Sequence, residues 1–348
     1  MIESSKEKLQ KKKSTQVKKG RKEGDNVKYE ERIRPSKLDE IIGRGTEKET
    51  LKIMIKSANR RKEVIDHILF YGPPGLGKTT FAVAIANEIG ANIKVTSGPA
   101  IERQGDLAAI LTGLKPNDVL FIDEIHRLSK VVEEILYPAM EDRMLDIVMG
   151  KGPTAKTIRL NLEPFTLIGA TTQIGKISSP MRDRFGLIQR LDFFSDNDLV
   201  QILQRACRLW DLEIEKDAVQ ALSEASRGTA RVGLRLLRRC RDYAQSHGGD
   251  KITVDVVEKT LKLLGTDKQG LEKIDRVILS TMLNHFSGGP IGLSTLAASI
   301  SEDESTVADV YEPYLMKCGF IKRTSRGRVL TQKGLKYLES LENEKGRG

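Results

Sequence analysis

The sequence contains few cysteines and no long apolar run. Its three cysteines, Cys207, Cys240 and Cys318, are far apart and include no Cys-x-x-Cys spacing. Neither a disulfide framework nor a zinc site is therefore expected. No stretch approaches the length of a membrane span, and the N-terminus lacks an apolar signal region. These absences argue against secreted and membrane proteins, and we expect a cytoplasmic protein.

The positive charge is concentrated at the two ends of the chain. The 348 residues carry a net charge of +10, and 39% of them are hydrophobic, enough for two or three domains. Residues 1–28 contain ten Lys or Arg against four Asp or Glu, and residues 317–348 contain nine against three. Clustered basic residues favour binding to phosphate backbones, so nucleic acid is the first partner to consider. Residues 1–28 have almost no apolar side chains, and we expect a basic disordered arm there, with or without a role in DNA contact.

A phosphate loop is the most informative motif. Residues 72–79 read Gly-Pro-Pro-Gly-Leu-Gly-Lys-Thr, between a strand-like apolar run at 68–71 and a helical pattern at 79–89. This arrangement aims backbone N–H groups and the positive end of a helix at the β- and γ-phosphates of a nucleotide. Lys78 adds a charge, and Thr79 supplies a ligand for Mg²⁺. The motif predicts a nucleoside triphosphatase.

A second motif supplies two carboxylates. Four apolar residues at 119–122 lead directly into Asp123 and Glu124. The pattern predicts a buried parallel strand that delivers Asp123 to the magnesium shell and Glu124 to the attacking water as general base. The alternative is that both acids only cap a following helix.

The hydrophobic patterns divide the chain into three folded regions. Residues 37–186 alternate strands at 68–71, 93–96, 119–122 and 165–169 with helices, which predicts a doubly wound parallel α/β domain. A hairpin at residues 146–160 is expected to protrude from it and make an external contact. Helical periodicity at 196–209, 216–226, 229–246 and 253–263 predicts a separate small helical domain.

The third region is typical of a winged helix. Helices are expected at 272–286, 294–300 and 306–318, followed by strands at 320–323 and 328–330 around a turn. Arg323, Arg326 and Arg328 near the tip suit contact with phosphate or the minor groove. The alternative is an edge strand that its charges protect from pairing.

The order of these motifs resembles that of the AAA+ ATPases and, more narrowly, of the RuvB family of bacterial Holliday-junction branch-migration motors. The resemblance rests on the phosphate loop, the Asp-Glu strand, and three further segments at 169–172, 182–186 and 228–231. It runs from about residue 32 to 331 and includes long stretches at 95–111, 118–142 and 311–315. It implies a large AAA+ domain at 29–192, a helical lid at 193–265 and a winged helix at 266–345, whereas the basic arm at 1–28 is longer than the family leads us to expect.

The resemblance also implies roles for individual residues. Thr172 would sense the γ-phosphate, Arg231 would be the second sensor, and Arg184 would be an arginine finger acting on the neighbouring subunit, although Arg182 competes for this role on sequence grounds alone. The residues implied in nucleotide binding are Ile33, Arg34, Gly75, Lys78, Thr79, Thr80, Glu141, Asp142, Arg143 and Phe194. Phe194 replaces a usual Tyr, and Ala230 and Leu234 replace a usual Pro and Asn, which leaves a specialised paralogue open.

The implied function is an ATP-driven homohexameric motor that moves four-way DNA junctions in recombination and repair. The hairpin at 146–160 would dock the junction-binding partner RuvA, the resolvase RuvC would join the complex, and Arg323 and Arg328 would touch DNA. Two other classes remain open from the residues. One is an initiator-like DNA switch with slow hydrolysis, and the other is a protein remodeller or clamp-loader relative.

Overall fold

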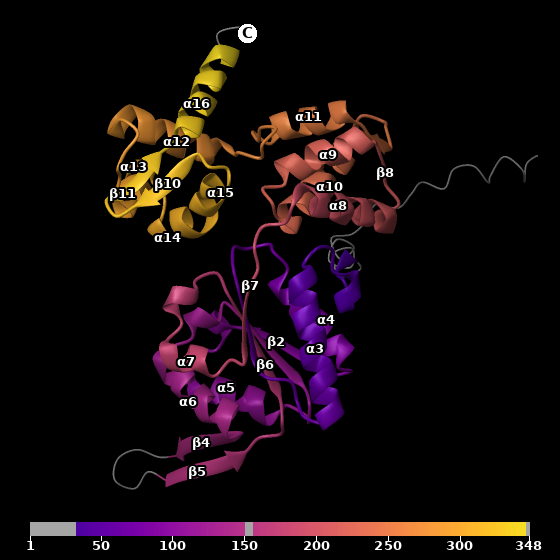
Figure 1. Ribbon diagram of the computed structural model, residues 1–348, viewed down its shortest axis with the longest axis vertical. Helices are drawn as coiled ribbons and strands as arrows, with labels where there is room; N and C mark the ends of the chain where they lie inside the picture. The colour runs from indigo at the N-terminus through magenta and orange to yellow at the C-terminus, as the bar shows by residue number, and fades with distance from the viewer. Residues whose placement is uncertain (1–32, 150–155, 346–348) are drawn as a thin grey trace, which may run out of the picture. The chain divides into compact units, whose positions relative to one another are not determined.

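The structure, a computed structural model, describes residues 33–149 and 156–345. The predicted arm at 1–28 and the tip of the predicted hairpin lie outside the described residues. Figure 1 shows a sheet flanked by helices, a group of helices, and a group of helices with a small hairpin.

The central sheet has five parallel strands in the order β2-β3-β6-β1-β7. The chain therefore crosses over between strands, and the carboxyl ends of β1, β3 and β6 meet at one edge, where ligands bind in open parallel sheets. The strands are β1 (Ile68–Tyr71), β2 (Ile93–Ser97), β3 (Val119–Asp123), β6 (Thr166–Thr171) and β7 (Leu187–Arg190).

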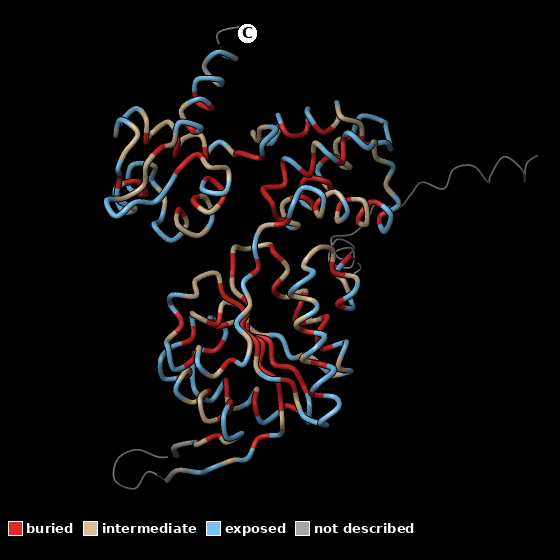
Figure 2. Tube along the Cα trace, in the orientation of Figure 1, coloured by how far each residue is buried: buried red, intermediate tan, exposed pale blue. Residues whose placement is uncertain are grey.

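Helices cover both faces of this sheet, and each face has its own apolar core. Along β1, Phe70 packs in one core with Phe81 of α4, whereas Leu69 faces the other core with Leu107 of α5 and Val132 of α6. The three inner strands β1, β3 and β6 are buried along almost their whole length (Figure 2), whereas the edge strands β2 and β7 are only partly buried. The doubly wound α/β prediction is confirmed. The helices are α3 (Gly45–Arg61), α4 (Lys78–Glu88), α5 (Gln104–Thr112), α6 (Lys130–Glu141) and α7 (Ser179–Asp183), with 3₁₀ turns at Leu38–Glu40, Gly98–Ala100, Ile125–Arg127 and Ile174–Lys176.

Two details of the sheet differ from the sequence prediction. The strand expected at 165–169 begins and ends later, as β6, so that Thr171 lies inside the strand. β7 was not predicted at all. It is an edge strand whose side chains alternate between exposed and half-buried, and four such residues lack the continuous apolar run that marks a central strand.

The predicted hairpin is present as two antiparallel strands. β4 (Met144–Met149) pairs with β5 (Lys156–Asn161) in the register Met144↔Asn161 to Met149↔Lys156. Figure 1 shows the pair projecting from the sheet domain. Arg159 and Asp146 form a salt bridge across the strands, with 2.8 Å between Nε and Oδ1.

The helical region follows the predicted pattern closely. It consists of α8 (Asp196–Trp210), α9 (Lys216–Ala225), α10 (Ala230–Ser246) and α11 (Val254–Leu263). A two-residue parallel pair, β8 (Glu213–Ile214) and β9 (Lys251–Ile252), was not predicted because so short a pairing leaves no periodic signal.

The last region is a winged helix with an additional C-terminal helix. Its elements are α12 (Lys273–Phe286), α13 (Leu293–Ser299), α14 (Glu304–Thr306), a π-helical turn (Val307–Tyr311), α15 (Glu312–Lys317), β10 (Ile321–Thr324), β11 (Gly327–Leu330) and α16 (Gln332–Lys345). The sequence analysis missed α16, whose buried Tyr337 and Leu338 are diluted among charged residues. Backbone hydrogen bonds between Ile291 and Arg328 add a third short strand segment beside β11.

Candidate functional site

The phosphate loop joins the carboxyl end of β1 to α4. The backbone is left-handed at Gly72 (φ 141°) and Gly75 (φ 80°). A Cβ on Gly72 would lie 2.3 Å from the carbonyl oxygen of Leu191, so only glycine permits this close approach. The loop turns directly into the first turn of α4, where Thr79 and Thr80 are half-buried and the helix has N–H groups without intrahelical partners.

The ammonium group of Lys78 lies over this loop. Its Nζ donates hydrogen bonds to the carbonyl oxygens of Gly72 (2.8 Å) and Pro73 (3.0 Å), and the residue is 7% exposed. Burial lowers the pKa of Lys78, and the charges of Glu124 and Asp123 oppose that effect. The loop therefore holds a cation beside the two carboxylates that the sequence predicts.

Arg231 approaches the same loop from the start of α10. A Cβ on Gly75 would lie 3.0 Å from the Cβ of Arg231 and 3.4 Å from the Cβ of Thr229. The structure thus places the predicted second sensor against a glycine of the phosphate loop.

The acid pair lies at the end of β3, beside β6. Glu124 has a left-handed backbone (φ 48°), and its N–H donates to Oδ1 of Asp123 at 3.0 Å. Its own Oε2 accepts hydrogen bonds from the backbone N–H and the hydroxyl of Thr172, each at 3.3 Å. The 3₁₀ turn that follows has no side-chain cap from Glu124. The predicted base and first sensor are therefore in contact, and the helix-capping alternative for Glu124 is not observed.

His126 also contacts Glu124, and no sequence motif predicts it as a site residue. Its Nδ1 lies 3.2 Å from Oε2 of Glu124 and 2.9 Å from the hydroxyl oxygen of Thr171. Burial lowers the pKa of His126, against the opposing charge of Glu124. The only sequence signal for His126 is its position two residues after Glu124. Spacing alone does not predict the turn that brings its ring back to the Glu124 carboxylate.

The predicted arginine finger lies at the end of α7 and contacts α6. Arg184 donates from Nη2 to Oε2 of Glu141 (2.9 Å) and from Nη1 to the carbonyl oxygen of Pro180 (2.7 Å). Its guanidinium group lies 4.4 Å from the centre of the Tyr137 ring. Within the described residues its Nε is buried without a hydrogen-bond partner. Arg182, the competing candidate, is half-buried.

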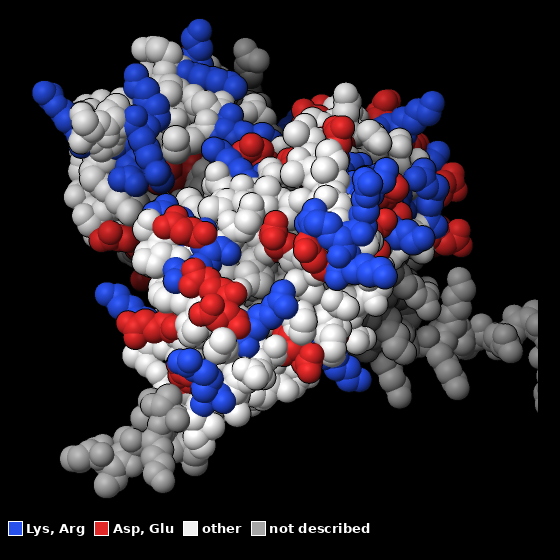
Figure 3. Space-filling view, turned by 60° about the horizontal axis from the view of Figure 1, so that its bottom comes forward, with Lys and Arg blue, Asp and Glu red and all other residues white. Residues whose placement is uncertain are grey.

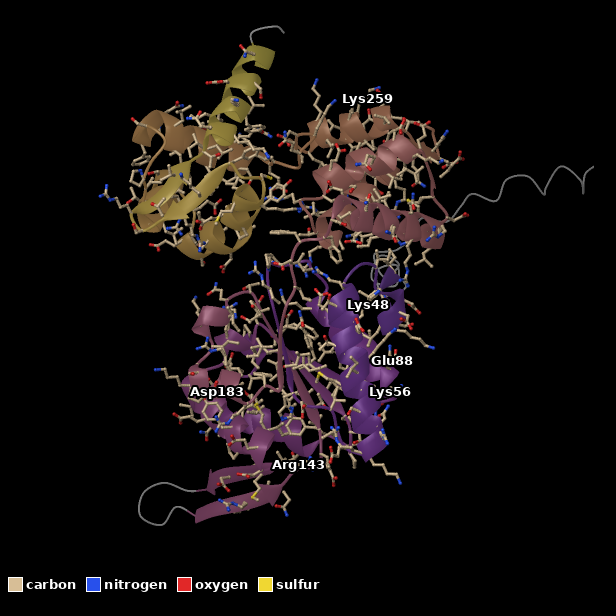
Figure 4. All side chains as sticks on the ribbon, viewed as in Figure 1. Lys48, Lys56, Glu88, Arg143, Asp183 and Lys259 are labelled. Atoms are coloured by element: carbon tan, nitrogen blue, oxygen red, sulfur yellow. The ribbon has the colours of Figure 1, made fainter. Side chains whose placement is uncertain are left out.

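The remaining nucleotide-binding candidates fall into separate places. Glu141 is joined to Arg184, while Arg143 lies at the base of the β4–β5 hairpin, where its carbonyl oxygen accepts a hydrogen bond from the N–H of Leu162 (Figure 4). Asp142 is the C-terminal cap of α6. Ile33 and Arg34 belong to the compact unit that ends at Arg34, so their contribution stays a prediction.

Phe194 is buried, and a residue that the sequence analysis missed covers its ring. The guanidinium carbon of Arg44 lies 4.4 Å from the centre of that ring, and Arg44 also donates a hydrogen bond to the carbonyl oxygen of Asp192. A phenylalanine can accept this cation without its missing hydroxyl group.

The three wing arginines differ in their surroundings. Arg326 is exposed at the turn between β10 and β11. Arg323 and Arg328 both donate to the carboxylate of Glu312, a residue that is 1% exposed. The sequence analysis passed over Glu312, although it lies in the stretch at 311–315 that was noted for its resemblance.

A second buried ion pair joins the helical region to the winged helix. Arg227, just before Gly228, donates to both carboxylate oxygens of Asp275 in α12, and the two side chains are 9% and 0% exposed. The Arg227 guanidinium also lies 4.3 Å from the centre of the Tyr314 ring. No sequence signal paired these residues.

On one face of the described structure, charges of both signs are mixed. Figure 3 shows basic and acidic side chains interspersed on the face drawn. Among the described residues, no helix is both long and apolar enough to cross a membrane.

Family models match three consecutive parts of the chain. They are the Holliday junction DNA helicase RuvB P-loop domain at residues 33–191, the RuvB AAA lid domain at 194–267, and the RuvB C-terminal winged helix domain at 268–339.

Solved structures of Thermotoga maritima RuvB are similar over almost their whole length. The Holliday junction branch migration motor of that organism is 48% identical, with a TM-score of 0.81, and the match covers 88% of this chain and 98% of that chain. Two point variants of the same protein give identities of 48% and 49% with TM-scores of 0.82 and the same coverage.

Proposed function

The chain belongs to the RuvB family of Holliday junction DNA helicases, and on this premise we propose which of its residues carry the reaction. It is a branch migration motor that hydrolyses ATP. The observation that supports the assignment most strongly is that Lys78, Glu124, Thr172 and Arg231 converge on one edge of the parallel sheet, around the phosphate loop.

The phosphate loop binds ATP. Backbone N–H groups at Gly75 and the start of α4 receive the phosphates, and Lys78 leaves its carbonyl partners to contact the β- and γ-phosphates. The hydroxyl of Thr79 and the carboxylate of Asp123 are hard oxygen donors, which suits Mg²⁺. When bound, Mg²⁺ neutralises charge that develops on the phosphate oxygens.

Glu124 activates the attacking water. It takes a proton from the water as the oxygen attacks the γ-phosphorus and the bond to the β-phosphate oxygen breaks. Thr172 fixes one carboxylate oxygen through two donors, so the other oxygen of Glu124 is left to accept the proton. Arg231, beside Gly75, responds to the γ-phosphate and transmits its loss to α10.

Arg184 acts on the nucleotide of a neighbouring subunit. Its partners in the described part of the chain, Glu141, Pro180 and Tyr137, all lie on α6 and α7, and none belongs to this chain's own phosphate loop. A finger supplied in trans makes hydrolysis depend on assembly, here as a homohexameric ring. The contact with Glu141 holds the finger until a neighbour presents its phosphates.

The remaining assignments follow from family membership. Arg323, Arg326 and Arg328 contact duplex DNA, and the β4–β5 hairpin at 146–160 docks RuvA, with RuvC in the resolving complex. The domain boundaries of the sequence analysis, at 28, 192 and 265, are kept as part of the proposal, as is a cytoplasmic location. Ile33, Arg34, Asp142, Arg143 and Phe194 are kept as nucleotide-side residues.

The deciding experiment is ATP-dependent dissociation of a synthetic four-way junction, with and without RuvA. Wild type is compared with Lys78→Ala and Arg184→Ala, and both substitutions should abolish dissociation. Mixing the two inactive variants should restore some hydrolysis, because an intact finger on one subunit then faces an intact loop on its neighbour. Arg182→Ala is the matched control and should keep most of the activity.

Two outcomes would count against the proposal. Hydrolysis by wild type without any movement of the junction would favour an initiator-like switch. Loss of activity in Arg182→Ala but not in Arg184→Ala would transfer the finger to Arg182.

A further inference from the structure

The two strands of the wing place two arginines directly opposite each other. Arg323 of β10 and Arg328 of β11 are register partners in the antiparallel pair, so their side chains leave the hairpin on the same face. Like charges in this arrangement destabilise a hairpin unless a third group compensates them. On its other side, β11 packs closely against the segment that contains Ile291. A Cβ on Gly327 would lie 2.4 Å from the carbonyl oxygen of Ile291.

The compensating group is the carboxylate of Glu312. Arg323 donates to its two oxygens from Nε (2.7 Å) and Nη2 (2.8 Å), and Arg328 donates in the same way at 2.9 and 3.1 Å. Burial would raise the pKa of Glu312, but the hydrogen bonds and charges of the two arginines outweigh it and lower this pKa. One carboxylate thus anchors two guanidinium groups through four charged hydrogen bonds.

The exposure of the three side chains is graded. The side chain of Glu312 is 1% exposed, that of Arg328 is 16% exposed and that of Arg323 is 53% exposed. The acid is therefore hidden beneath the arginines. Both guanidinium groups use the same edge, Nε and Nη2, toward the acid, and within the described residues Nη1 of each has no hydrogen-bond partner. Together, Glu312, Arg323 and Arg328 have a net charge of +1.

The helix that carries Glu312 is irregular just before it. The chain passes from α14 through the π-helical turn Val307–Tyr311 into α15, whose first residue is Glu312. A π turn changes which face the next residues present. Glu312 and Leu315 are buried, while Val310 and Met316 on the same helix are 49% and 38% exposed. The carboxylate thereby links the helix to the wing.

We infer that Glu312 is a positioning residue for DNA, which holds Arg323 and Arg328 in the orientation in which their free Nη1 groups contact two phosphates of a duplex. This inference rests on the proposed function of the wing. An arginine without such an anchor loses rotamer freedom when it binds. Glu312 orders both side chains beforehand, and because it is buried it does not face the DNA.

An account based on net charge alone and an account based on positioning of the arginines predict opposite changes in DNA affinity for Glu312→Gln. The substitution raises the net charge by one, so a purely electrostatic account expects tighter binding. If Glu312 positions the arginines, we expect DNA binding to weaken by about 5- to 10-fold, because Arg323 and Arg328 must then be ordered on the DNA. The measurement is fluorescence anisotropy of a labelled duplex at several salt concentrations, with the full-length chain. Glu304→Gln is the matched control. It removes one exposed acid from α14, ahead of the π-helical turn, and should leave affinity unchanged or slightly higher.

A double-substitution cycle separates positioning from a general structural effect. In an Arg323→Gln background, Glu312→Gln should have much less effect on affinity than in wild type, whereas in an Arg326→Gln background its effect should persist. Thermal unfolding and ATP hydrolysis without DNA identify a variant that has not folded. For that case Arg323→Lys provides a second test at an exposed site. Lysine keeps the charge but cannot form the two-pronged contact, so affinity should fall almost as far as in Arg323→Gln.

Failure of this inference differs from failure of the proposed function. If wild type binds duplex and Glu312→Gln binds equally or more tightly, or if Arg323→Lys binds as wild type does, Glu312 is only a structural brace. If neither Arg323→Gln nor Arg328→Gln alters DNA affinity, the proposed wing contact is itself wrong, and the role of Glu312 falls with it.

Discussion

The catalytic edge of the sheet and the wing hold their charged groups in different ways. At the catalytic edge, Thr172 donates two hydrogen bonds of 3.3 Å to Glu124, His126 Nδ1 lies 3.2 Å from the same oxygen, and Lys78 donates to the neutral carbonyl oxygens of Gly72 and Pro73. In the wing, Glu312 is buried and bound by four charged hydrogen bonds, and the Arg227–Asp275 pair is buried in the same manner. On the proposed function, the groups that rearrange around each nucleotide are held by weaker contacts, whereas the groups that present one fixed shape are anchored by buried ion pairs.

The largest expected effect is on ATP hydrolysis and concerns Glu124, one of the weakly held groups. Glu124→Gln keeps the shape and the contact with Thr172 but cannot accept a proton, so the rate of ATP hydrolysis should fall by about 10²- to 10⁴-fold. ATP affinity should change little. Single-turnover hydrolysis and nucleotide binding measure the two quantities separately. A variant that loses ATP binding to the same degree would show that Glu124 is part of the binding site and not only the base.

The next effect is on stability and concerns the buried Arg227–Asp275 ion pair. Asp275→Asn removes the charge that compensates buried Arg227, and it should lower the free energy of unfolding by about 2–4 kcal/mol. Asp255→Asn is the control, because its partner Lys259 is exposed and such pairs contribute roughly 0.5 kcal/mol. Denaturant unfolding of both variants measures the difference. Equal losses would mean that burial does not distinguish the two classes of ion pair.

A smaller effect is expected at Thr172. Thr172→Val removes the hydroxyl donor to Glu124 but leaves the backbone donor, so kcat should fall by about 10-fold, as for one hydrogen bond to a charged group. Thr172→Ser should restore most of the activity. If valine is fully active, the sensor role does not depend on the hydroxyl group.

The smallest effect concerns acid stability of the wing. The pKa of Glu312 is lowered in the folded state, so its stabilising contribution is complete above its ordinary value of 4.5 and is lost as pH falls through the lower folded value. The stability difference between wild type and Glu312→Gln should therefore shrink below about pH 4.5. Urea unfolding at pH 6 and at pH 4 or below tests this, and a difference that grows on acidification would contradict it.

Local patterns predicted most of the fold. The phosphate loop, four strands and the helices of the lid carry their signals within a few residues, and the structure places the bounds of these strands and helices within two residues of the prediction. β7 and α16 were missed for a common reason. β7 is a short edge strand, and the buried side chains of α16 are separated by charged residues, so neither shows a dense apolar pattern.

The site was predictable where chemistry follows a strand end. Lys78, Asp123 and Glu124 are fixed by the ends of β1 and β3, and adjacent parallel strands bring Thr172 to them. His126, Arg44 and Glu312 were not predictable, because their contacts depend on turns and on residues far apart in the sequence. Glu312 and Arg328 are 16 positions apart and meet only through the hairpin. Spacing alone cannot indicate that a helix acid will lie beneath two wing arginines.

One short segment lies between the phosphate loop and the winged helix. Arg231 touches a glycine of the phosphate loop, and Arg227, four positions earlier, is bound to Asp275 of the winged helix. Four residues of chain extend at most about 14 Å. Because this connection is so short, a displacement of Arg231 is transmitted almost directly to Arg227 and to α12. On the proposed function, this segment is a short route by which loss of the γ-phosphate can reach the winged helix, and its length is less than three turns of helix.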